Sequence, residues 1–213
     1  MSWKRARSSD QKAERIDAIL EAAATLFDEK DFLDISMRDV AEQAGLGKAS
    51  LYHYFKTKEE VFISLYRIEL EDWKADALKR LRRIRTPNPE RVAKLLTDAL
   101  RDRPRFCRLT VVFSSVLERN LSVEFIREFK MSLLEPLEQF SIAMMESLDG
   151  MTESSIQDFL MQYHALVAGL WPLAHPSPEV AAILEEPEFV GLRTDFFRLF
   201  ECTLRQILTE AAK

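Results

Sequence analysis

The sequence predicts an all-α fold of about nine helices, and two observations support this. The 213 residues include only 5 glycines and 8 prolines, which are the residues that the tight turns of sheet proteins require. Apolar side chains recur along most of the chain at the three- and four-residue spacing that places them on one face of a helix. Because 47% of the residues are hydrophobic, such helices can bury a full core.

Helix one is expected from Ile16 to Phe27, after a polar N-terminal arm. The chain then breaks near residues 28–31. Helix two is expected to start at Ser36, because the Ser36 hydroxyl can accept a backbone N–H of the first turn while the Asp39 carboxylate reaches back.

A glycine turn separates helix two from helix three. Gly45-Leu46-Gly47 contains the residue type that best adopts a positive φ, and the leucine between the glycines can reach the small core. Helix three follows over residues 48–54, with Leu51 and Phe55 pointing inward. Thr57 and Glu60 have the spacing of a cap for helix four.

Six longer helices are expected in the rest of the chain, separated mainly by proline and glycine. Their expected ranges are 61–81, 92–100, 109–117, 126–140, 152–171 and 189–211. Pro136 removes a backbone donor and is expected to kink the helix over 126–140. Pro172, Pro176 and Pro178 are expected to open an irregular loop. The basic run 79–83 suits a solvated helix end, and a second DNA contact is the alternative.

The charge distribution is uneven although the net charge is only −5. Residues 1–15 carry five basic and two acidic side chains, and residues 44–58 carry three basic ones and no acidic one. Residues 16–43 between them carry two basic and eight acidic side chains. Two basic segments therefore flank an acidic one, which is compatible with local binding to nucleic acid despite the negative total.

Several classes of protein are not indicated. Cys107 and Cys202 are the only cysteines and lie far apart, so neither a disulfide framework, nor a zinc site, nor any other cofactor is expected. No apolar run approaches the roughly 18 residues of a membrane span, and the basic N-terminus is not followed by a signal-peptide apolar stretch. A soluble, cytoplasmic protein without a membrane partner is expected.

Residues 36–58 have the form of a helix-turn-helix, with two short helices around a glycine turn. Such a unit places its second helix in the major groove of DNA, where exposed residues meet base edges and flanking donors hold the backbone. The alternative is that Gly45-Leu46-Gly47 is only a turn and that Tyr52 and Tyr54 are half-buried core residues.

The segment Leu51-Tyr52-His53-Tyr54-Phe55-Lys56-Thr57-Lys58-Glu59-Glu60, after Val40-Ala41-Glu42-Gln43-Ala44-Gly45, resembles the DNA-binding signature of the tetracycline-repressor (TetR) family. The resemblance covers roughly residues 13–62. It implies a dimeric, ligand-responsive repressor that binds a palindromic double-stranded operator, with half-sites about one DNA turn, 34–36 Å, apart or a multiple of that.

The resemblance also assigns roles to single residues. It places Tyr52 and Lys58 on phosphates, and Lys48, Ala49, Ser50 and His53 at the bases. The remaining candidate contacts are Ser36, Arg38, Gly47 and Tyr54. Gly47 stands where many members have a residue that caps the recognition helix, so the first turn of this helix is expected to be held less firmly.

The chain is expected to divide into an N-terminal arm with the helix-turn-helix domain, residues 1–58, and a helical effector-binding and dimerisation domain, residues 59–213. The last two helices are the candidate dimer interface, because two helices from each subunit make a four-helix bundle. The candidate interface residues are Phe159, Tyr163, Phe196, Phe200, Leu204 and Ile207. The alternative is that they pack only within one subunit.

A small, mainly apolar effector is expected in the second domain. The candidate lining residues are Phe106, Phe113, Met144, Tyr163, His164 and Trp171, each of which is alternatively an ordinary core residue. An activator with the same DNA-binding unit remains an alternative. A helical enzyme is a weaker one, because His53, His164 and His175 show no metal-ligand pairing and no phosphate-binding glycine loop occurs.

Overall fold

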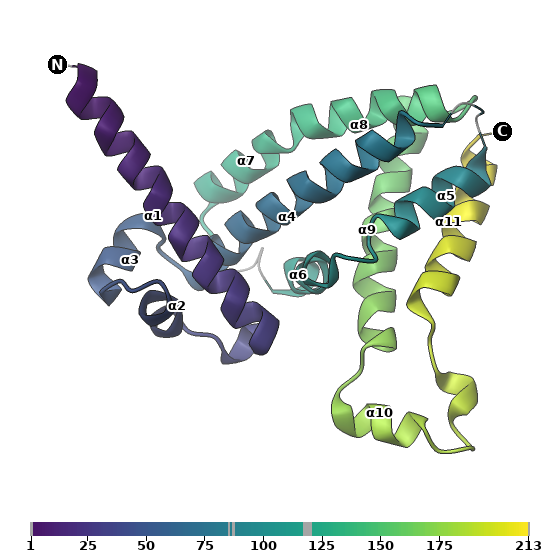
Figure 1. Ribbon diagram of the computed structural model, residues 1–213. Coiled ribbons are helices and arrows are strands. Elements are labelled where there is room, and N and C mark those ends of the chain that lie inside the picture. The colour runs from purple at the N-terminus through teal and green to yellow at the C-terminus, as the bar shows by residue number, and fades with distance from the viewer. Residues whose placement is uncertain (1, 85, 87, 117–120, 213) are drawn as a thin grey trace.

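A computed structural model describes residues 2–84, 86, 88–116 and 121–212, and every regular element in these residues is a helix (Figure 1). The all-α prediction is therefore confirmed. The elements are α1 (Ser2–Glu29), η1 (Phe32–Asp34), α2 (Met37–Gln43), α3 (Lys48–Tyr54), α4 (Lys58–Leu81), α5 (Pro89–Asp98), α6 (Pro104–Ser115), α7 (Val123–Ser132), α8 (Leu134–Ser147), α9 (Glu153–Ala174), α10 (Pro178–Leu184), η3 (Val190–Leu192) and α11 (Phe196–Ala211).

The N-terminal helices α1, α2 and α3 form a small unit that also packs on the start of α4. Its centre is aromatic: the ring of Phe62 in α4 lies 5.5 Å from the ring of Phe27 and 5.1 Å from the ring of Phe32. Figure 1 shows the first half of α1 extending away from the remainder of the chain, with α2 and α3 beside it. The start of α4 thus belongs to the core of the N-terminal unit, while its later turns belong to the larger one.

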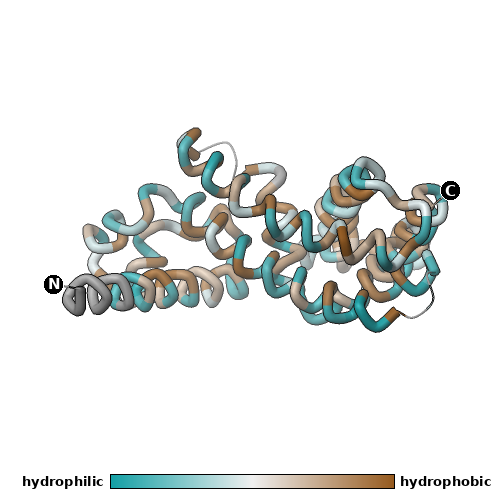
Figure 2. The backbone as a smooth tube through the Cα atoms, turned by 90° about the horizontal axis from the view of Figure 1, so that it is seen from above, coloured by the Kyte–Doolittle hydropathy of each residue, from teal (hydrophilic) through white to brown (hydrophobic). Residues whose placement is uncertain are grey.

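The larger unit is a bundle around α4. In Figure 1, α7 and α8 run alongside α4, and α9 and α11 lie side by side at the opposite end of the molecule from α3. Helix α5 packs on α11, and α6 packs between α4 and α9. The tube in Figure 2 alternates between hydrophilic and hydrophobic segments along most helices, as expected when each helix buries one face.

The centre of this bundle contains a cluster of aromatic side chains around Tyr66 and Trp73 of α4. The Tyr66 ring stacks at 5.7 Å on Phe106 and at 4.8 Å on Phe113. The Trp73 indole N–H donates a hydrogen bond to the Tyr163 hydroxyl at 3.1 Å, and that hydroxyl donates to the Leu96 carbonyl at 3.2 Å. This buried chain of hydrogen bonds joins α4, α9 and α5.

Two expectations about helix boundaries are wrong at the start and middle of the chain. The polar arm before Ile16 is an extension of α1, which begins at Ser2. The helix expected over 126–140 is two helices that meet at Leu133, three residues before Pro136. The proline ring conflicts with the carbonyl four residues earlier, that of Ser132, so the first helix ends there and Pro136 lies in the first turn of the next. Leu117, the expected end of an earlier helix, lies outside the described residues.

The region from Pro172 to Asp195 also differs from the expectation. Helix α9 continues through Pro172 to Ala174, and the expected irregular loop contains α10, in which Pro178 occupies the first helical position. The last helix begins at Phe196 instead of Phe189, because the Asp195 side chain caps it by accepting a hydrogen bond from the Arg198 N–H at 3.0 Å. None of the described helices is long and apolar enough to cross a lipid bilayer.

Candidate nucleic-acid interface

Helix α2 begins with the reciprocal cap that the sequence predicts. The Asp39 N–H donates to the Ser36 hydroxyl at 3.2 Å, and the Ser36 N–H donates to the Asp39 carboxylate at 2.8 Å. The hydrogen bonds from Ser36 hold the pKa of the Asp39 carboxyl below its usual value. Arg38 is exposed on the same helix and pairs with Glu42 at 2.7 Å, one helical turn along. The cap fixes the angle at which the chain enters the helix-turn-helix.

The turn between α2 and α3 depends on one glycine. Gly45 has a φ of 65°, in the left-handed region that a residue with a Cβ enters only at a cost. The Gly45 N–H donates to the Glu42 carbonyl at 3.1 Å, and the Leu46 N–H donates to the Ala41 carbonyl at 2.8 Å. Leu46 packs against the core, as expected. These contacts set the direction in which α3 leaves α2.

Gly47 precedes α3 and provides no side-chain cap, so the first turn of α3 is closed by backbone contacts alone. Its φ of −67° is available to other residues, and space for a Cβ is open. A capping serine or threonine therefore fits this position sterically.

Helix α3 divides its residues between core and solvent as the sequence predicts. Leu51 is fully buried and Phe55 nearly so, whereas five of the candidate DNA-contacting residues are exposed. These are Lys48, Ala49, Ser50, Tyr52 and His53. The Tyr52 side chain is 43% exposed, and the Lys48 ammonium lies 5.9 Å from the centre of its ring. The exposed face therefore holds hydrogen-bonding and basic groups on a rigid helix.

Tyr54 is placed differently from Tyr52. It is half-buried against the core, and its ring lies 5.9 Å from the His53 ring. Tyr54 is therefore partly a core residue, as the alternative interpretation of the sequence has it, whereas Tyr52 is not.

Lys58, the candidate phosphate anchor at the start of α4, is held by the protein itself. Its ammonium donates to the Phe32 carbonyl at 2.7 Å and to the Ile35 carbonyl at 2.6 Å, and it lies 4.1 Å from the centre of the Phe32 ring. Burial lowers the pKa of the Lys58 ammonium. Two of its three N–H groups are thereby used to join α4 to the segment before α2.

Glu60 is a structural residue at this interface that the cap pattern identifies only in part. Its N–H donates to the Thr57 hydroxyl at 3.1 Å, as predicted. Its carboxylate, however, accepts a hydrogen bond from the Lys56 N–H at 2.6 Å instead of bonding to the backbone of Thr57. Glu60 is buried, and this hydrogen bond holds the connection between α3 and α4 from the core side.

The candidate effector residues lie in two places. Phe106, Phe113 and Tyr163 contact Tyr66 or Trp73 of α4, and His164 lies edge-on to Phe113 at 5.9 Å. Trp171 lies elsewhere, stacked on His175 at 3.8 Å and edge-on to Phe196. Met144 is fully buried in α8. The tertiary structure therefore gathers four of the six residues into one cluster.

The candidate dimer residues are largely buried within one chain. Phe159, Tyr163, Phe196, Phe200 and Leu204 are each less than 5% exposed in the single subunit, and Ile207 is half-buried. Phe200 contacts Tyr163 edge-on at 5.1 Å, so α11 uses this face against α9. A side chain without accessible surface adds little area to an interface, so five of the six candidate residues are covered by their own subunit.

Comparisons with known proteins agree on one family. Residues 19–65 match the family described as "Bacterial regulatory proteins, tetR family", and residues 68–209 match "Tetracyclin repressor-like, C-terminal domain". The HTH-type transcriptional repressor KstR2 of Mycolicibacterium smegmatis is 40% identical over 63 residues, 30% of each chain. This match therefore spans less than a third of that relative.

Solved structures match over most of the chain. A putative transcriptional regulator from Rhodococcus sp. RHA1 has a TM-score of 0.62 at 15% identity, covering 92% of this chain and 95% of the other. The fatty acid degradation regulator FadR from Bacillus halodurans has a TM-score of 0.58 at 19% identity, covering 91% and 94%. At these identities the matches establish a shared fold.

Proposed function

This chain belongs to the tetracycline-repressor family of bacterial regulatory proteins, and we propose that it is a repressor that binds a palindromic operator and is released by a small, mainly apolar effector. The observation that carries the proposal is the exposed face of α3. Lys48, Ser50, Tyr52 and His53 project from a helix fixed by the α2 cap, the Gly45 turn and buried Glu60. A rigid helix with exposed donors suits the major groove.

Single residues of this face have distinct proposed roles. Lys48, Ala49, Ser50 and His53 contact bases, and Ala49 is small enough to pack on a thymine methyl group. The Tyr52 hydroxyl donates a hydrogen bond to a phosphate. Lys58 donates to a phosphate with its third ammonium N–H, which is not used by the Phe32 and Ile35 carbonyls. Because the family consists of regulatory proteins, the enzyme alternative is set aside.

A palindromic operator requires a homodimer, which we place on the outer faces of α9 and α11. Both helices bury one face within the subunit and leave apolar side chains on the other, with Leu173 60% and Leu199 37% exposed. Leu166 of α9 and Ile207 of α11 are half-buried and pack against the core. Two such helix pairs, one from each subunit, make a four-helix bundle that buries these side chains.

The apolar character of the proposed effector is supported by the polar groups of the aromatic cluster. The Trp73 indole and the Tyr163 hydroxyl bond to each other and to the Leu96 carbonyl. Among the described residues no buried side-chain nitrogen or oxygen lacks a hydrogen-bond partner. A ligand that enters between α4, α6 and α9 therefore meets aromatic surface and satisfied polar groups, which favours apolar contacts. The structurally similar FadR of Bacillus halodurans is a fatty acid degradation regulator, which is in keeping with this class.

Selection from a random duplex library tests the proposal. The purified protein is incubated with the library at moderate salt, and the bound fraction is sequenced. We expect enrichment of one palindrome, whose half-sites lie about 34–36 Å apart or a multiple of that. Addition of long-chain fatty acids or other apolar compounds should then release the selected duplex. A library that stays unenriched, with and without such compounds, would contradict sequence-specific binding.

Repression and activation are distinguished by the position of the selected operator. A repressor site overlaps the promoter of the gene that it controls, and a reporter gene is silenced when the protein is expressed. Stimulation of the reporter would instead support the activator alternative, because the same helix-turn-helix contacts serve either outcome.

A further inference from the structure

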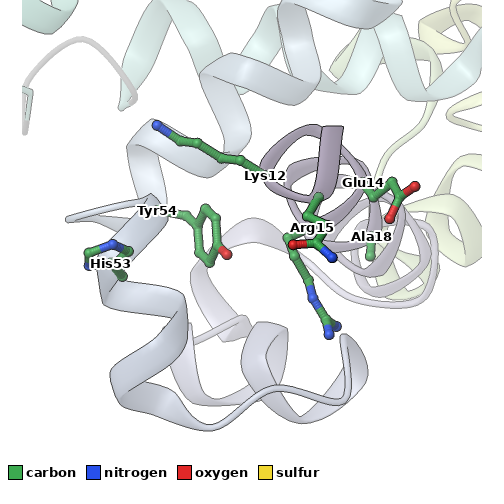
Figure 3. A pocket seen from close by; sticks show the side chains of 7 residues that line it. Lys12, Glu14, Arg15, Ala18, His53 and Tyr54 are labelled. Carbon is green, nitrogen blue, oxygen red and sulfur yellow. The ribbon is translucent and has the colours of Figure 1, made fainter. Parts of the chain in front are cut away.

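A groove of about 770 Å³ separates the first half of α1 from α3 (Figure 3). Residues of both helices line it: Gln11, Lys12, Glu14, Arg15, Ala18, His53 and Tyr54. In the view of Figure 3, the side chains of Lys12 and Arg15 extend from α1 on the two sides of the Tyr54 ring. The groove is thus walled by a basic stretch of α1 and by the C-terminal turn of α3.

Among the side chains that the structure describes, which begin at residue 11, the two basic groups of the groove have no partner. Lys12 and Arg15 are exposed, and neither forms a hydrogen bond or an ion pair with any of those side chains. Glu14 is the one carboxylate among the lining residues. In the sequence, the preceding turns of α1 add Lys4, Arg5 and Arg7 against Asp10 alone. Unpaired cations next to one another repel, and an anionic partner relieves that repulsion.

His53 relates the groove to the face of α3. It is exposed on that helix and also lines the groove, so the groove borders the exposed face of α3. When a recognition helix lies in the major groove, a sugar–phosphate backbone passes along each side of it. A groove that borders this face of α3 can therefore lie against one of these backbones.

We propose that this groove receives a phosphate strand of the operator, with Lys12 and Arg15 as phosphate-binding residues that extend the contact of α3 onto the flanking backbone. This inference rests on the proposed DNA-binding function and names contacts beyond the helix-turn-helix itself. Lys12 and Arg15 add affinity without reading sequence, because phosphates are alike at every base pair. Glu14 opposes the same strand by charge repulsion.

The first test replaces both cations by the uncharged Lys12→Gln/Arg15→Gln pair and measures affinity for the selected operator between 50 mM and 400 mM salt. Loss of two phosphate contacts in each subunit, four in the dimer, should make the slope of log K against log salt less steep by about 3.6 and weaken operator binding roughly 100- to 1,000-fold near 0.15 M salt. The base preference in a repeated library selection should stay unchanged. The matched control is Arg82→Gln/Arg83→Gln, which changes the net charge equally; these residues directly follow α4, at its end away from α3, where a contact with the same DNA is not expected.

A second variant strengthens the test because a folding defect cannot imitate its result. Glu14→Gln should raise operator affinity several-fold, since it removes the one carboxylate that lines the groove. If wild-type protein binds its operator while the Lys12/Arg15 and Arg82/Arg83 variants lose affinity equally, the groove does not hold a phosphate strand. If wild-type protein selects no operator at all, the proposed function fails first, and the two failures are thereby distinguished.

Discussion

Arg105 of α6 donates a hydrogen bond to Asp28 at the end of α1, with Nε and Oδ1 2.9 Å apart, and so joins the larger helical unit to the N-terminal one. The same guanidinium donates to Glu69 of α4 at 2.9 Å. These two carboxylates raise the pKa of Arg105. Three residues later, Arg108 donates to the Lys30 carbonyl at 3.0 Å and lies over the Phe27 ring at 4.4 Å. Two arginines of α6 thus hold the C-terminal end of α1.

Arg105→Gln should lower the free energy of unfolding by about 1 kcal/mol, because a partly exposed charge network is lost while its carboxylates remain solvated. Urea unfolding of the free protein measures this. Arg80→Gln is the control, since it removes an ion pair with Asp76 inside one helix and should cost about 0.5 kcal/mol or less. If α6 sets the position of α1, Arg105→Gln should also weaken operator binding under conditions in which both variants are fully folded, and Arg80→Gln should not.

Lys58 is predicted to have a structural role that is separable from any contact with DNA. Lys58→Met keeps much of the apolar stem and removes both hydrogen bonds to the Phe32 and Ile35 carbonyls. We expect a loss of about 1–3 kcal/mol in unfolding free energy. Lys56→Met, an exposed neighbour, should leave stability within about 0.5 kcal/mol of wild type.

The same Lys58 variant tests the proposed phosphate contact. Operator affinity of Lys58→Met should fall alike for all duplexes, and the slope of log K against log salt should become less steep by about 1.8, because the dimer loses one phosphate contact in each subunit. An unchanged slope together with the loss of stability would restrict Lys58 to its structural role.

The hydrogen bond between Trp73 and Tyr163 predicts a second stability effect. Tyr163→Phe removes the hydroxyl and leaves the Trp73 indole N–H and the Leu96 carbonyl buried without a partner. Such a change should cost about 1–3 kcal/mol. Trp73→Phe should lower the free energy of unfolding less in the Tyr163→Phe background than in wild type, because the hydrogen bond between the two side chains is already lost there. A double-mutant cycle by urea unfolding measures this coupling, and strictly additive effects would mean that the two side chains act independently.

The features that the sequence predicted correctly are those fixed by neighbouring residues. The cap of Ser36 and Asp39 spans four residues, and the burial of Leu51 and Phe55 follows from helical spacing within α3. The resemblance to a family identified α3 as the candidate interface because its signature is a continuous segment. Local chemistry and a contiguous motif were sufficient for these parts.

The features that the sequence did not predict depend on residues far apart in the chain. Lys58 bonds to carbonyls 26 and 23 residues earlier, and Tyr163 bonds to Trp73 across 90 residues. Apolar spacing in α11 showed which face is buried but not whether its own subunit or a partner covers it. The α1–α3 groove likewise needed the packing of both helices, although the basic N-terminal segment was a visible signal.

The reciprocal cap of α2 predicts an acid-sensitive contribution to stability. The folded-state pKa of Asp39 is below its ordinary value, so the stabilisation is complete above the unfolded-state pKa near 3.8 and is lost as the pH falls through the folded-state pKa. Ser36→Ala should lower stability at pH 7 by about 1 kcal/mol. The difference between wild type and Ser36→Ala should shrink below about pH 4. A difference that is constant from pH 7 to pH 2.5 would mean that the Asp39 charge does not contribute.

The proposed dimer interface makes the last prediction. Leu173→Glu/Leu199→Glu places two charges on the outer faces of α9 and α11, where they cannot be buried in a four-helix bundle without a large desolvation penalty. We expect dissociation to monomers by light scattering at micromolar concentration, and a full palindrome that is bound no more tightly than a single half-site. Met131→Glu, on the exposed side of α7, is the control and should remain dimeric. A double variant that stays dimeric would show that the interface lies on another face. A wild-type protein that is monomeric would contradict the proposed homodimer and, with it, the palindromic operator.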